Sequence, residues 1–495
     1  PKAVAALQAI TPPASLQKAW ASACLSCAES LPKSEAGRIY RRIFDGPYDI
    51  VSRAAALAGL VRTGQMKAGE LVAVLKGKEP QLQVAAAQLS SELREKAAVQ
   101  GYVAALPALP AHLQVIVISG FAASKNRAAA TAAAALAESA DAEVVTAALR
   151  ALGEIGDASH VPMLMRLALG KDERAALAFA SLTRLPGAAV DAALAKSLRS
   201  SDARERVRAI EAFAARMDRR QNKAILAACK DADKDVRIAA YKALRSLADD
   251  SMLPALADLL IATDSGAERG ELEQTVTATA LRAASADAAA EVLIARLGRS
   301  VETDAILLGV LAKRGGSKAL AEVRRRVGSN DPEQRKAAVR AMSAWADTAP
   351  LGDLMNVAQN DPDAACRTLA LRGYVRLVAD SNLSVDEKVK MFQSALEAAK
   401  QPDAIKQILA GLGGLKELAS LKVVMGQLDN AAVASEAAAA ALSISQELVT
   451  RRKLRDKAVA DALMQIQKNQ TVSEAQRKQA ASLLKRMSQS ESKSK

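Results

Sequence analysis

The sequence predicts an all-α protein, built as a solenoid of repeated helix hairpins, from its composition, its length and a recurring motif. Hydrophobic residues make up 50% of the 495-residue chain, but aromatic residues only 2%. Because Ala and Leu supply most of the apolar side chains, the composition favours closely packed helices over sheets, which are rich in β-branched and aromatic residues. Single cores stop growing at about 250–300 residues, so a chain of this length divides into domains or extends as repeats.

The recurring motif is a run of small apolar residues behind an Arg. Residues 233–247 read DKDVRIAAYKALRSL, and degenerate copies occur at 52–60, 144–152, 334–342 and 366–374. The separations are 34 residues from Arg174 to Arg208, 29 from Arg208 to Arg237, and 32 from Arg335 to Arg367. A period of about thirty residues is typical of helical-hairpin repeats.

Each repeat is expected to pair this helix with an earlier one. The segments 161–168 and 253–260 carry Pro162 and Pro254 near their starts, where a missing N–H is harmless. In the second helix, Ala239, Ala240 and Ala243 share one face and allow a neighbouring hairpin to approach closely. Since such a hairpin cannot bury its apolar face alone, we expect the hairpins to stack into one right-handed superhelix.

These residues resemble the HEAT-repeat family, specifically the bacterial PBS-lyase HEAT-like repeats, over about residues 38–448. The residues that carry the resemblance are Pro162, Pro254, Asp233, Val236, Arg237, Ala239, Ala240, Ala243 and Leu244. One residue rather than two separates Arg237 from Ala239, which departs from the family pattern. Segments 39–43, 56–60 and 369–377 also resemble long, often exported bacterial HEAT-repeat proteins. This narrower resemblance implies scaffolding without catalytic residues, whereas the lyase resemblance implies assisted attachment of a chromophore.

We expect four segments along the chain: a partial repeat over 1–34, the HEAT-like array over 35–380, longer helical repeats over 381–450, and basic helices with a disordered tail over 451–495. Breaks in the period predict a polar loop at 263–270 and a connection at 379–385, before a helix at 386–400. The chain begins at Pro1 without an initiating Met, so we expect it to be processed or truncated. It contains no run of 18 apolar residues that would predict a membrane span.

The basic charge is concentrated at the C-terminal end. Residues 451–495 contain twelve Lys or Arg and four Asp or Glu, which accounts for +8 of the formal net charge of +14. A capping-box pattern from Thr471 to Glu474 predicts the start of the second helix there. We favour a solvated pair of capping helices, because terminal repeats need a polar outer face. The alternative is a surface that binds nucleic acid or another anionic partner, and the candidate residues are Arg451, Arg452, Lys453 and Arg455.

Motifs with catalytic or metal-binding potential are sparse. Cys24 and Cys27 form a C-x-x-C on a helix predicted over 21–31, without a second pair or a nearby His, so we interpret them as small apolar residues and leave a redox role open. His112 and His160 stand near helix starts, where surface or capping roles are expected. The glycines at 411–414 predict a chain reversal between two helices rather than a dinucleotide loop. No cofactor is implied.

The Arg of the motif has two interpretations. Arg53, Arg208, Arg237, Arg335 and Arg367 form a ladder if the repeats stack regularly. Such a ladder suits an acidic partner. The family resemblance instead implies bonds to Asp or to backbone carbonyls of a neighbouring turn, and we favour this structural role.

The sequence therefore predicts a non-catalytic scaffold that binds a protein partner in an inner groove formed by the second helix of each repeat. Lys242 and Arg245, at exposed positions of such a helix, are candidate contacts. Nucleic-acid or anionic-surface binding through the C-terminal helices is the alternative function. Cys229 and Cys366 follow the apolar periodicity, and cysteine usage does not decide between cytosol and bacterial envelope, although the narrower resemblance points to export.

Overall fold

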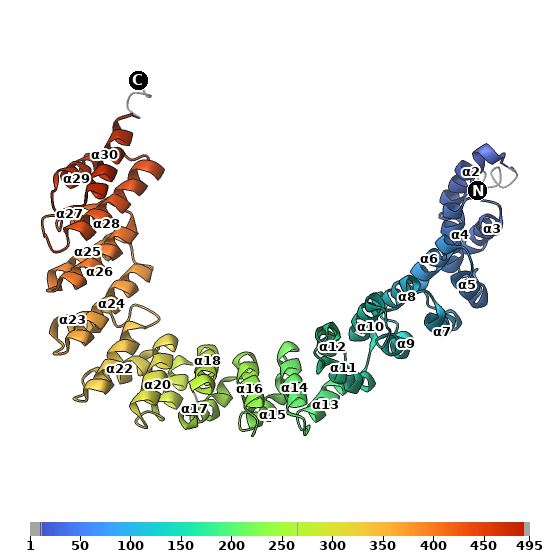
Figure 1. The fold of residues 1–495 in the computed structure, drawn as a ribbon, viewed down its shortest axis with the longest axis horizontal. Helices are drawn as coiled ribbons and strands as arrows, with labels where there is room; N and C mark the ends of the chain where they lie inside the picture. The colour runs from blue at the N-terminus through green and yellow to red at the C-terminus, as the bar shows by residue number, and fades with distance from the viewer. Residues whose placement is uncertain (1–9, 11, 265, 490–495) are drawn as a thin grey trace. The chain divides into compact units, whose positions relative to one another are not determined.

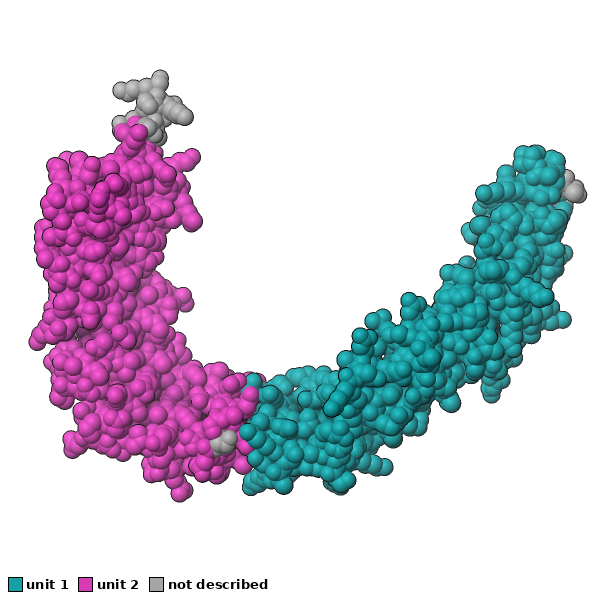
Figure 2. All heavy atoms as spheres, in the orientation of Figure 1, with its two compact units in different colours: residues 1–247 teal, residues 248–495 magenta. Residues whose placement is uncertain are grey.

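The computed structural model describes residues 10, 12–264 and 266–489. Throughout these residues the regular structure is helical, with α-helices and short 3₁₀ or π turns and no β-strand (Figure 1). The chain forms two compact units, residues 1–247 and residues 248–495 (Figure 2). The predicted all-α class is confirmed.

In unit 1, residues 1–247, the helices alternate between two layers. One layer consists of the odd-numbered helices α3 (Lys33–Asp45), α5 (Ala68–Leu75), α7 (Lys96–Ala105), α9 (Ala130–Leu136), α11 (Val161–Ala168), α13 (Ala188–Ser197) and α15 (Asn222–Ala228). The other consists of the even-numbered helices α2 (Gln17–Ala28), α4 (Ile50–Thr63), α6 (Pro80–Gln88), α8 (Ala111–Ala123), α10 (Ala142–Ile155), α12 (Glu173–Arg184), α14 (Ala203–Ala215) and α16 (Lys234–Leu247). Each even-numbered helix contacts the next one along the unit, so this layer is continuous.

Unit 2, residues 248–495, repeats the same alternation. Its odd-numbered helices are α17 (Leu253–Ala262), α19 (Ala286–Ile294), α21 (Ser317–Val327), α23 (Leu351–Asn360), α25 (Val385–Ala398), α27 (Leu418–Met425) and α29 (Lys457–Lys468). Its even-numbered helices are α18 (Gly266–Arg282), α20 (Val301–Arg314), α22 (Pro332–Ser343), α24 (Ala364–Asp380), α26 (Pro402–Leu415), α28 (Ala434–Gln446) and α30 (Glu474–Gln489). Consecutive even-numbered helices again contact one another, so each unit is an α-solenoid of helix hairpins.

Acidic caps begin many of the even-numbered helices. The carboxylate of Asp141 accepts hydrogen bonds from the backbone N–H groups of Glu143 and Val144, at 2.9 and 3.1 Å. The same cap recurs at Asp49, Asp202, Asp331 and Asp363. Because each cap satisfies a backbone donor that the helix leaves unpaired, it contributes about 1 kcal/mol to stability.

Small residues control how closely the even-numbered helices pack. The predicted face of α16 is buried, with Ala240 fully covered and Ala243 3% exposed. In unit 2, a Cβ atom on Gly373 of α24 would lie 2.5 Å from the Cα atom of Ser343 in α22. The Ser343 hydroxyl donates to the carbonyl of Leu369 at 3.0 Å. Backbone therefore meets backbone between α22 and α24, and Gly373 is required for this approach.

The motif Arg has the structural role that we favoured. Arg367 donates to the carbonyls of Asp361 and Pro362, in the turn before its own helix, at 2.7 and 3.0 Å. Arg335 donates in the same way to the carbonyl of Ser329 at 3.0 Å, and its Nε lies 3.6 Å from the carboxylate of Asp361 in the next repeat. Each motif Arg thus ties its own turn and, where a carboxylate follows, also the next one.

The prediction that Arg208 belongs to the arginine ladder was wrong. In α14 the motif position belongs to Arg206, which donates to the carbonyl of Ser200 at 2.8 Å and pairs with Asp231 of the next repeat at 2.8 Å. Arg208 instead pairs with Glu211 within the same helix, and its guanidinium lies 5.2 Å from the ring centroid of Phe179. The motif Arg stands four residues after the Asp that caps its helix. Since Asp202 caps α14, the motif Arg of this helix is Arg206.

A second set of arginines, which the sequence analysis missed, lies near the C-terminal ends of even-numbered helices. Arg216 donates to the carbonyls of Thr183 and Leu185, at 3.0 and 2.8 Å, where α12 ends. Arg314 and Arg376 donate in the same way to carbonyls at 283, and 343 and 345. Since the last carbonyls of a helix have no partner within it, these arginines complete the preceding even-numbered helix.

Both predicted loops are shorter than expected. Of residues 263–270, only Thr263 and Asp264 are described outside a helix, because α18 already begins at Gly266. The connection predicted at 379–385 is reduced to residues 381–384, since α24 extends through Asp380. Ser384 and Glu387 form a reciprocal capping box that starts α25 at Val385, and this helix ends at Ala398 rather than at residue 400.

The glycines at 411–414 do not reverse the chain. They lie inside α26, and the reversal follows at Lys416, which has a φ of 57°. A Cβ atom on Gly413 would lie 3.0 Å from that of Ala440 in α28. The glycines therefore allow α26 and α28 to pack closely.

Helix starts and ends also differ at the two ends of the chain. Helix α2 begins at Gln17 and ends at Ala28, earlier than the predicted range 21–31. The capping box predicted from Thr471 to Glu474 is formed two residues later, by Ser473 and Gln476. Of the tail predicted to be disordered, residues 490–495 lie outside the described residues, while Ser488 still belongs to α30.

Candidate functional site

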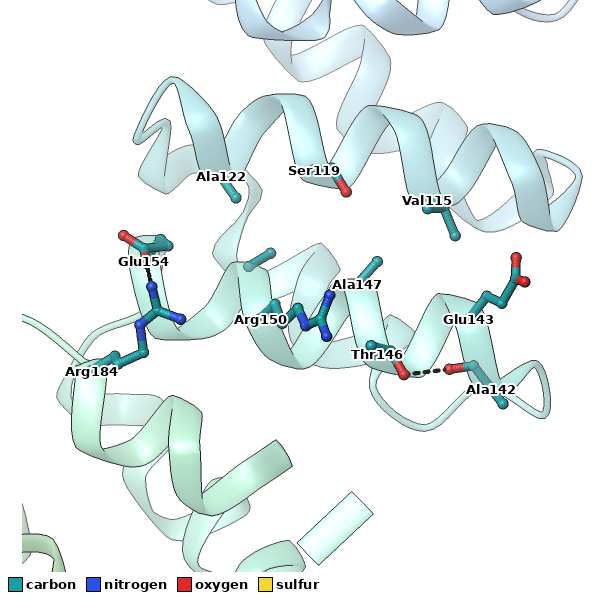
Figure 3. Close-up of a pocket in the computed structure, with 11 residues that line it drawn as sticks. Val115, Ser119, Ala122, Ala142, Glu143, Thr146, Ala147, Arg150, Glu154 and Arg184 are labelled. Atoms are coloured by element: carbon teal, nitrogen blue, oxygen red, sulfur yellow. Dashed lines mark hydrogen bonds and ion pairs between the residues drawn. The ribbon is translucent and has the colours of Figure 1, made fainter. Parts of the chain in front are cut away.

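The even-numbered helices are the second helices of the predicted repeats. Their solvent-facing side, which we call the outer face, contains a groove in each unit. In unit 1 the groove lies between α8 and α10 and has a volume of about 600 Å³. Small or apolar side chains line much of it, as Figure 3 shows for Val115, Ser119 and Ala122 from α8 and Ala147 from α10. The α8 side of the groove therefore carries no charged side chain.

The charges in the unit 1 groove are balanced. Glu154 pairs with Arg184 from α12 at 2.7 Å (Figure 3), while Glu143 lies at the other end of the groove. Arg150 is exposed and makes no ion pair with any residue that the structure describes. Two carboxylates thus accompany two guanidiniums along this groove.

In unit 2 a groove of about 760 Å³ lies between α24 and α26, and it extends over the turns before these helices to the C-terminal ends of α23 and α25. Polar side chains line it, among them Thr368 from α24 and Gln407 from α26, beside the apolar Leu371 and Ala404. Four basic residues and two acidic ones also belong to its lining: Arg367, Arg372, Lys400, Lys406, Asp361 and Asp403. The groove in unit 2 therefore carries an excess of positive charge.

The basic residues of the unit 2 groove differ in their partners. Lys406 pairs with Glu436 at 3.1 Å and lies 4.0 Å from Asp403. Arg367 is hydrogen-bonded to backbone carbonyls only. Arg372 and Lys400 are exposed, and neither has a carboxylate within ion-pair distance among the described residues. Two full positive charges thus face the groove without an anionic partner.

The candidates Lys242 and Arg245 lie on α16, on the same layer. Lys242 is exposed and Arg245 is half-buried. Lys242 stands nine residues after Asp233, whose carboxylate accepts from the N–H groups of Asp235 and Val236. Three other helices carry an Arg at the same distance from their capping Asp: Arg150, Arg340 and Arg372 stand nine residues after the caps of α10, α22 and α24. One register position therefore repeatedly carries a positive charge to the outer face, a signal present in the sequence that we missed.

The four C-terminal candidates lie together around a π-helical turn, Glu447–Arg451, that follows α28. Arg452 forms two hydrogen bonds to Glu417, at 2.8 and 2.9 Å, and Arg455 donates to the carbonyls of Val449 and Leu454. Arg451 lies 3.6 Å from Glu447 and is 80% exposed, and Lys453 is also exposed.

The helices that follow this segment pack against the repeats before them. Helix α29 contacts α27, and α30 contacts α28. Val459, Leu463 and Leu483 are buried in this packing. The C-terminal hairpin thus continues the layers of unit 2.

The cysteines do not form a disulfide. Cys24 is buried, and burial together with the neighbouring Cys27 raises the pKa of its thiol. Burial also raises the pKa of Cys229 to about 12 and raises the pKa of Cys366. Deprotonation, which thiol chemistry requires, is therefore disfavoured at these three buried sites.

The histidines lie at helix starts. Nδ1 of the buried His160 accepts a hydrogen bond from the backbone N–H of Asp157 and lies 2.9 Å from the carboxylate of Asp157, in a capping box before α11. His112 is exposed in the first turn of α8. In the part of the chain that the structure describes, His, Cys, Asp and Glu residues nowhere gather in threes as a metal site would need. No described helix combines the length and apolarity needed to cross a bilayer.

Comparison with known proteins adds a family match over part of the chain. A sequence profile of HEAT repeats matches residues 191–277, which extend from α13 into α18. No curated protein sequence matches the chain.

Several solved structures match the chain at low sequence identity and low TM-score. Yeast importin-β (Kap95p) is 14% identical, with a TM-score of 0.37, and the match covers 92% of this chain and 67% of that one. Kap121p is 12% identical, with a TM-score of 0.42 and coverage of 93% and 57%. This chain thus spans little more than half the length of Kap121p. The sequence match to HEAT repeats is thus confined to residues 191–277, and the hairpins before and after them have the same two-layer arrangement within their own unit.

Proposed function

We propose that the protein is a non-catalytic scaffold that binds a protein partner along the outer face of its even-numbered helices. The observation that carries this proposal is the continuity of that layer within each unit, because an unbroken row of parallel ridges and grooves presents one extended surface. Binding surfaces of repeat proteins commonly have this form.

The two grooves support the choice of face. Both lie between neighbouring even-numbered helices, α8 and α10 in unit 1 and α24 and α26 in unit 2. Lys242 and Arg245 belong to the same layer and are proposed as further contacts. Exposed side chains on this layer vary between repeats while the buried small residues recur, so the outer face can be specific for a partner without a cost to packing.

Site-specific photo-crosslinking in native lysate tests the proposed face. A photoreactive amino acid is placed at Ser119 on α8 or at Thr368 on α24, both exposed on the even-numbered layer. Matched controls carry it at Ala73 on α5 and at Lys422 on α27, both exposed on the odd-numbered layer. We expect the same protein to be crosslinked from an even-layer position and not from either control. Crosslinks that form only from Ala73 or Lys422 would contradict the proposal.

The alternative function, binding of nucleic acid or another anionic surface by the C-terminal segment, rests on the exposed Arg451 and Lys453. The double variant Arg451→Glu/Lys453→Glu tests it and leaves the α29–α30 hairpin in place. Salt-dependent retention of duplex DNA or anionic liposomes that this variant abolishes would support the alternative. Equal retention by the variant and the unaltered chain would count against it.

A further inference from the structure

We propose that the groove between α24 and α26 binds an extended, acidic segment of a partner protein. This inference deepens the proposed scaffold function and rests on it. Four basic side chains and two carboxylates line the groove, and the two cations Arg372 and Lys400 lack an ion-pair partner among the described residues. An occupant with carboxylates would supply the missing counter-charges.

The cations come from different elements that the fold brings together. Arg367 and Arg372 project from α24, and Lys400 lies in the turn between α25 and α26. Arg367 is held in place by the carbonyls of Asp361 and Pro362, at 2.7 and 3.0 Å. The nearest candidate for its counter-charge, the carboxylate of Asp361, faces Arg335 at 3.6 Å instead. A guanidinium that is already ordered loses little freedom when it binds a carboxylate.

The neutral lining suits a peptide backbone. Thr368 and Gln401 offer hydroxyl and amide groups beside the cations. Gln407 also lines the groove, and its Oε1 atom is buried without a hydrogen-bond partner among the described residues. A peptide N–H is the kind of donor that this oxygen lacks, because a buried acceptor without a partner costs free energy.

The width of the groove argues for a polypeptide rather than a nucleic-acid duplex. Packed helices lie about 8–10 Å apart, so a groove between two of them admits an extended chain or a side-chain row but not a double helix. The charges also lie inside the groove rather than on a broad basic face. An extended acidic peptide satisfies both the shape and the charge.

The groove of unit 1 provides a matched control. Arg150 stands nine residues after its capping Asp, as Arg372 does, and is exposed in the same way. Its groove, however, also contains Glu143 and Glu154, which balance the charge. The same charge reversal at Arg150 and at Arg372 therefore changes the net charge of the protein equally but alters only one basic groove.

The experiment measures binding of a short rhodamine-labelled peptide of alternating Glu and Ser to the full chain by fluorescence anisotropy, at low and high salt. A peptide with Gln in place of Glu is the second probe. We expect the Glu peptide to bind in a salt-dependent way and the Gln peptide to bind at least about tenfold more weakly. We expect Arg372→Glu to weaken Glu-peptide binding at least about fivefold and Arg372→Glu/Lys400→Glu about tenfold or more. Arg150→Glu, which changes the net charge as Arg372→Glu does, should change binding less than about twofold.

Three results would overturn the assignment: no binding of the Glu peptide, equal loss from Arg150→Glu and Arg372→Glu, or loss caused by Arg451→Glu/Lys453→Glu instead. Circular dichroism of each variant shows whether its helices are intact. The scaffold function itself is judged separately by the crosslinks from Ser119 and Thr368. A partner that is crosslinked there equally well in Arg372→Glu/Lys400→Glu would refute the acidic groove and leave the scaffold standing.

Discussion

The grooves of the two units show how one architecture produces two different surfaces. Both lie between neighbouring even-numbered helices, and both expose an Arg nine residues after the helix cap, Arg150 in unit 1 and Arg372 in unit 2. Around Arg150 lie alanines and two glutamates, whereas Lys400 and Lys406 accompany Arg372. The buried face of a repeat sets the packing, and the outer face is free to vary, so ligand chemistry can change between repeats without a change of fold.

Two joints between neighbouring even-numbered helices, one from each unit, also differ in their contacts. In unit 1, Arg216 directly after α14 donates to the carbonyls where α12 ends, and Asp191 of α13 pairs with it at 2.7 Å; the two side chains are 13% and 9% exposed. In unit 2, α22 and α24 meet through the close contact of Gly373 with Ser343. The arginine of the first joint is anchored by a buried carboxylate, whereas the second joint, which Arg376 also bridges, requires the absence of a side chain at Gly373. Each joint can be tested where its counterpart is unaffected.

The largest expected effect comes from Arg216→Ala in unit 1. The substitution removes both hydrogen bonds to the end of α12 and leaves the buried Asp191 with the exposed Arg220 in place of two arginines, so we expect the free energy of unfolding to fall by about 3 kcal/mol. Hydrogen exchange should accelerate in α12–α14 and stay unchanged in α22–α24. The control Arg184→Ala breaks a pair whose Arg is 63% exposed, and we expect it to cost about 0.5 kcal/mol. Equal effects from both variants would contradict the distinction.

The next effect is expected from Gly373→Ala in unit 2. Its new Cβ atom would meet the Cα atom of Ser343 at 2.5 Å, and because backbone must move to relieve this contact, we expect a loss of about 2 kcal/mol. Gly309 in α20 is the matched control, since a Cβ atom there meets nothing within 4 Å. Gly309→Ala should stabilise the chain by about 0.5–1 kcal/mol through helix propensity. Chemical denaturation measures the free energy of unfolding of both variants. Stabilisation by Gly373→Ala would refute the close contact between α22 and α24.

The smallest effect is an acid-dependent loss of stability. Arg325, and then Arg326, lower the pKa of Glu322 in unit 2, and Arg206 lowers the pKa of Asp231 in unit 1. A carboxylate whose pKa is lowered on folding contributes stability above its unfolded pKa of about 4, and loses it as the pH falls through the lower folded value.

The melting temperature of the chain should therefore decrease as the pH falls below about 4. Glu322→Gln should flatten this decrease in unit 2 but not in unit 1, which hydrogen exchange across the same pH range can separate. An unchanged acid response in unit 2 would show that Glu322 does not contribute to it.

The sequence predicted the hairpins well because their packing rules are local. The alanines of residues 233–247 and the prolines Pro162 and Pro254 mark buried faces and helix starts that depend only on spacing along one helix. Arg208 was chosen instead of Arg206 because α14 carries Arg at 204, 206 and 208, and only the carbonyls of the preceding turn distinguish them.

The grooves and the glycine positions could not be predicted in the same way. The glycines at 411–414 have the composition of a turn, but their role depends on Ala440, which lies on another helix. Arg372 of α24 and Lys400 of the turn between α25 and α26 are brought to one groove by the packing of neighbouring hairpins, which the spacing within a single helix does not specify. Contacts between repeats therefore have to be read from the structure.

The arginines at the ends of the even-numbered helices decide where the chain can be shortened. Arg216, for example, supplies donors to the last carbonyls of α12 from the following even-numbered helix. A fragment that stops after α12 loses those donors and frays at its final helix, whereas one that continues through Arg216, directly after α14, retains them. Fragments made for expression or crystallisation should therefore include one hairpin more than the last hairpin of interest. The added hairpin supplies the donors that the preceding helix needs at its C-terminal end.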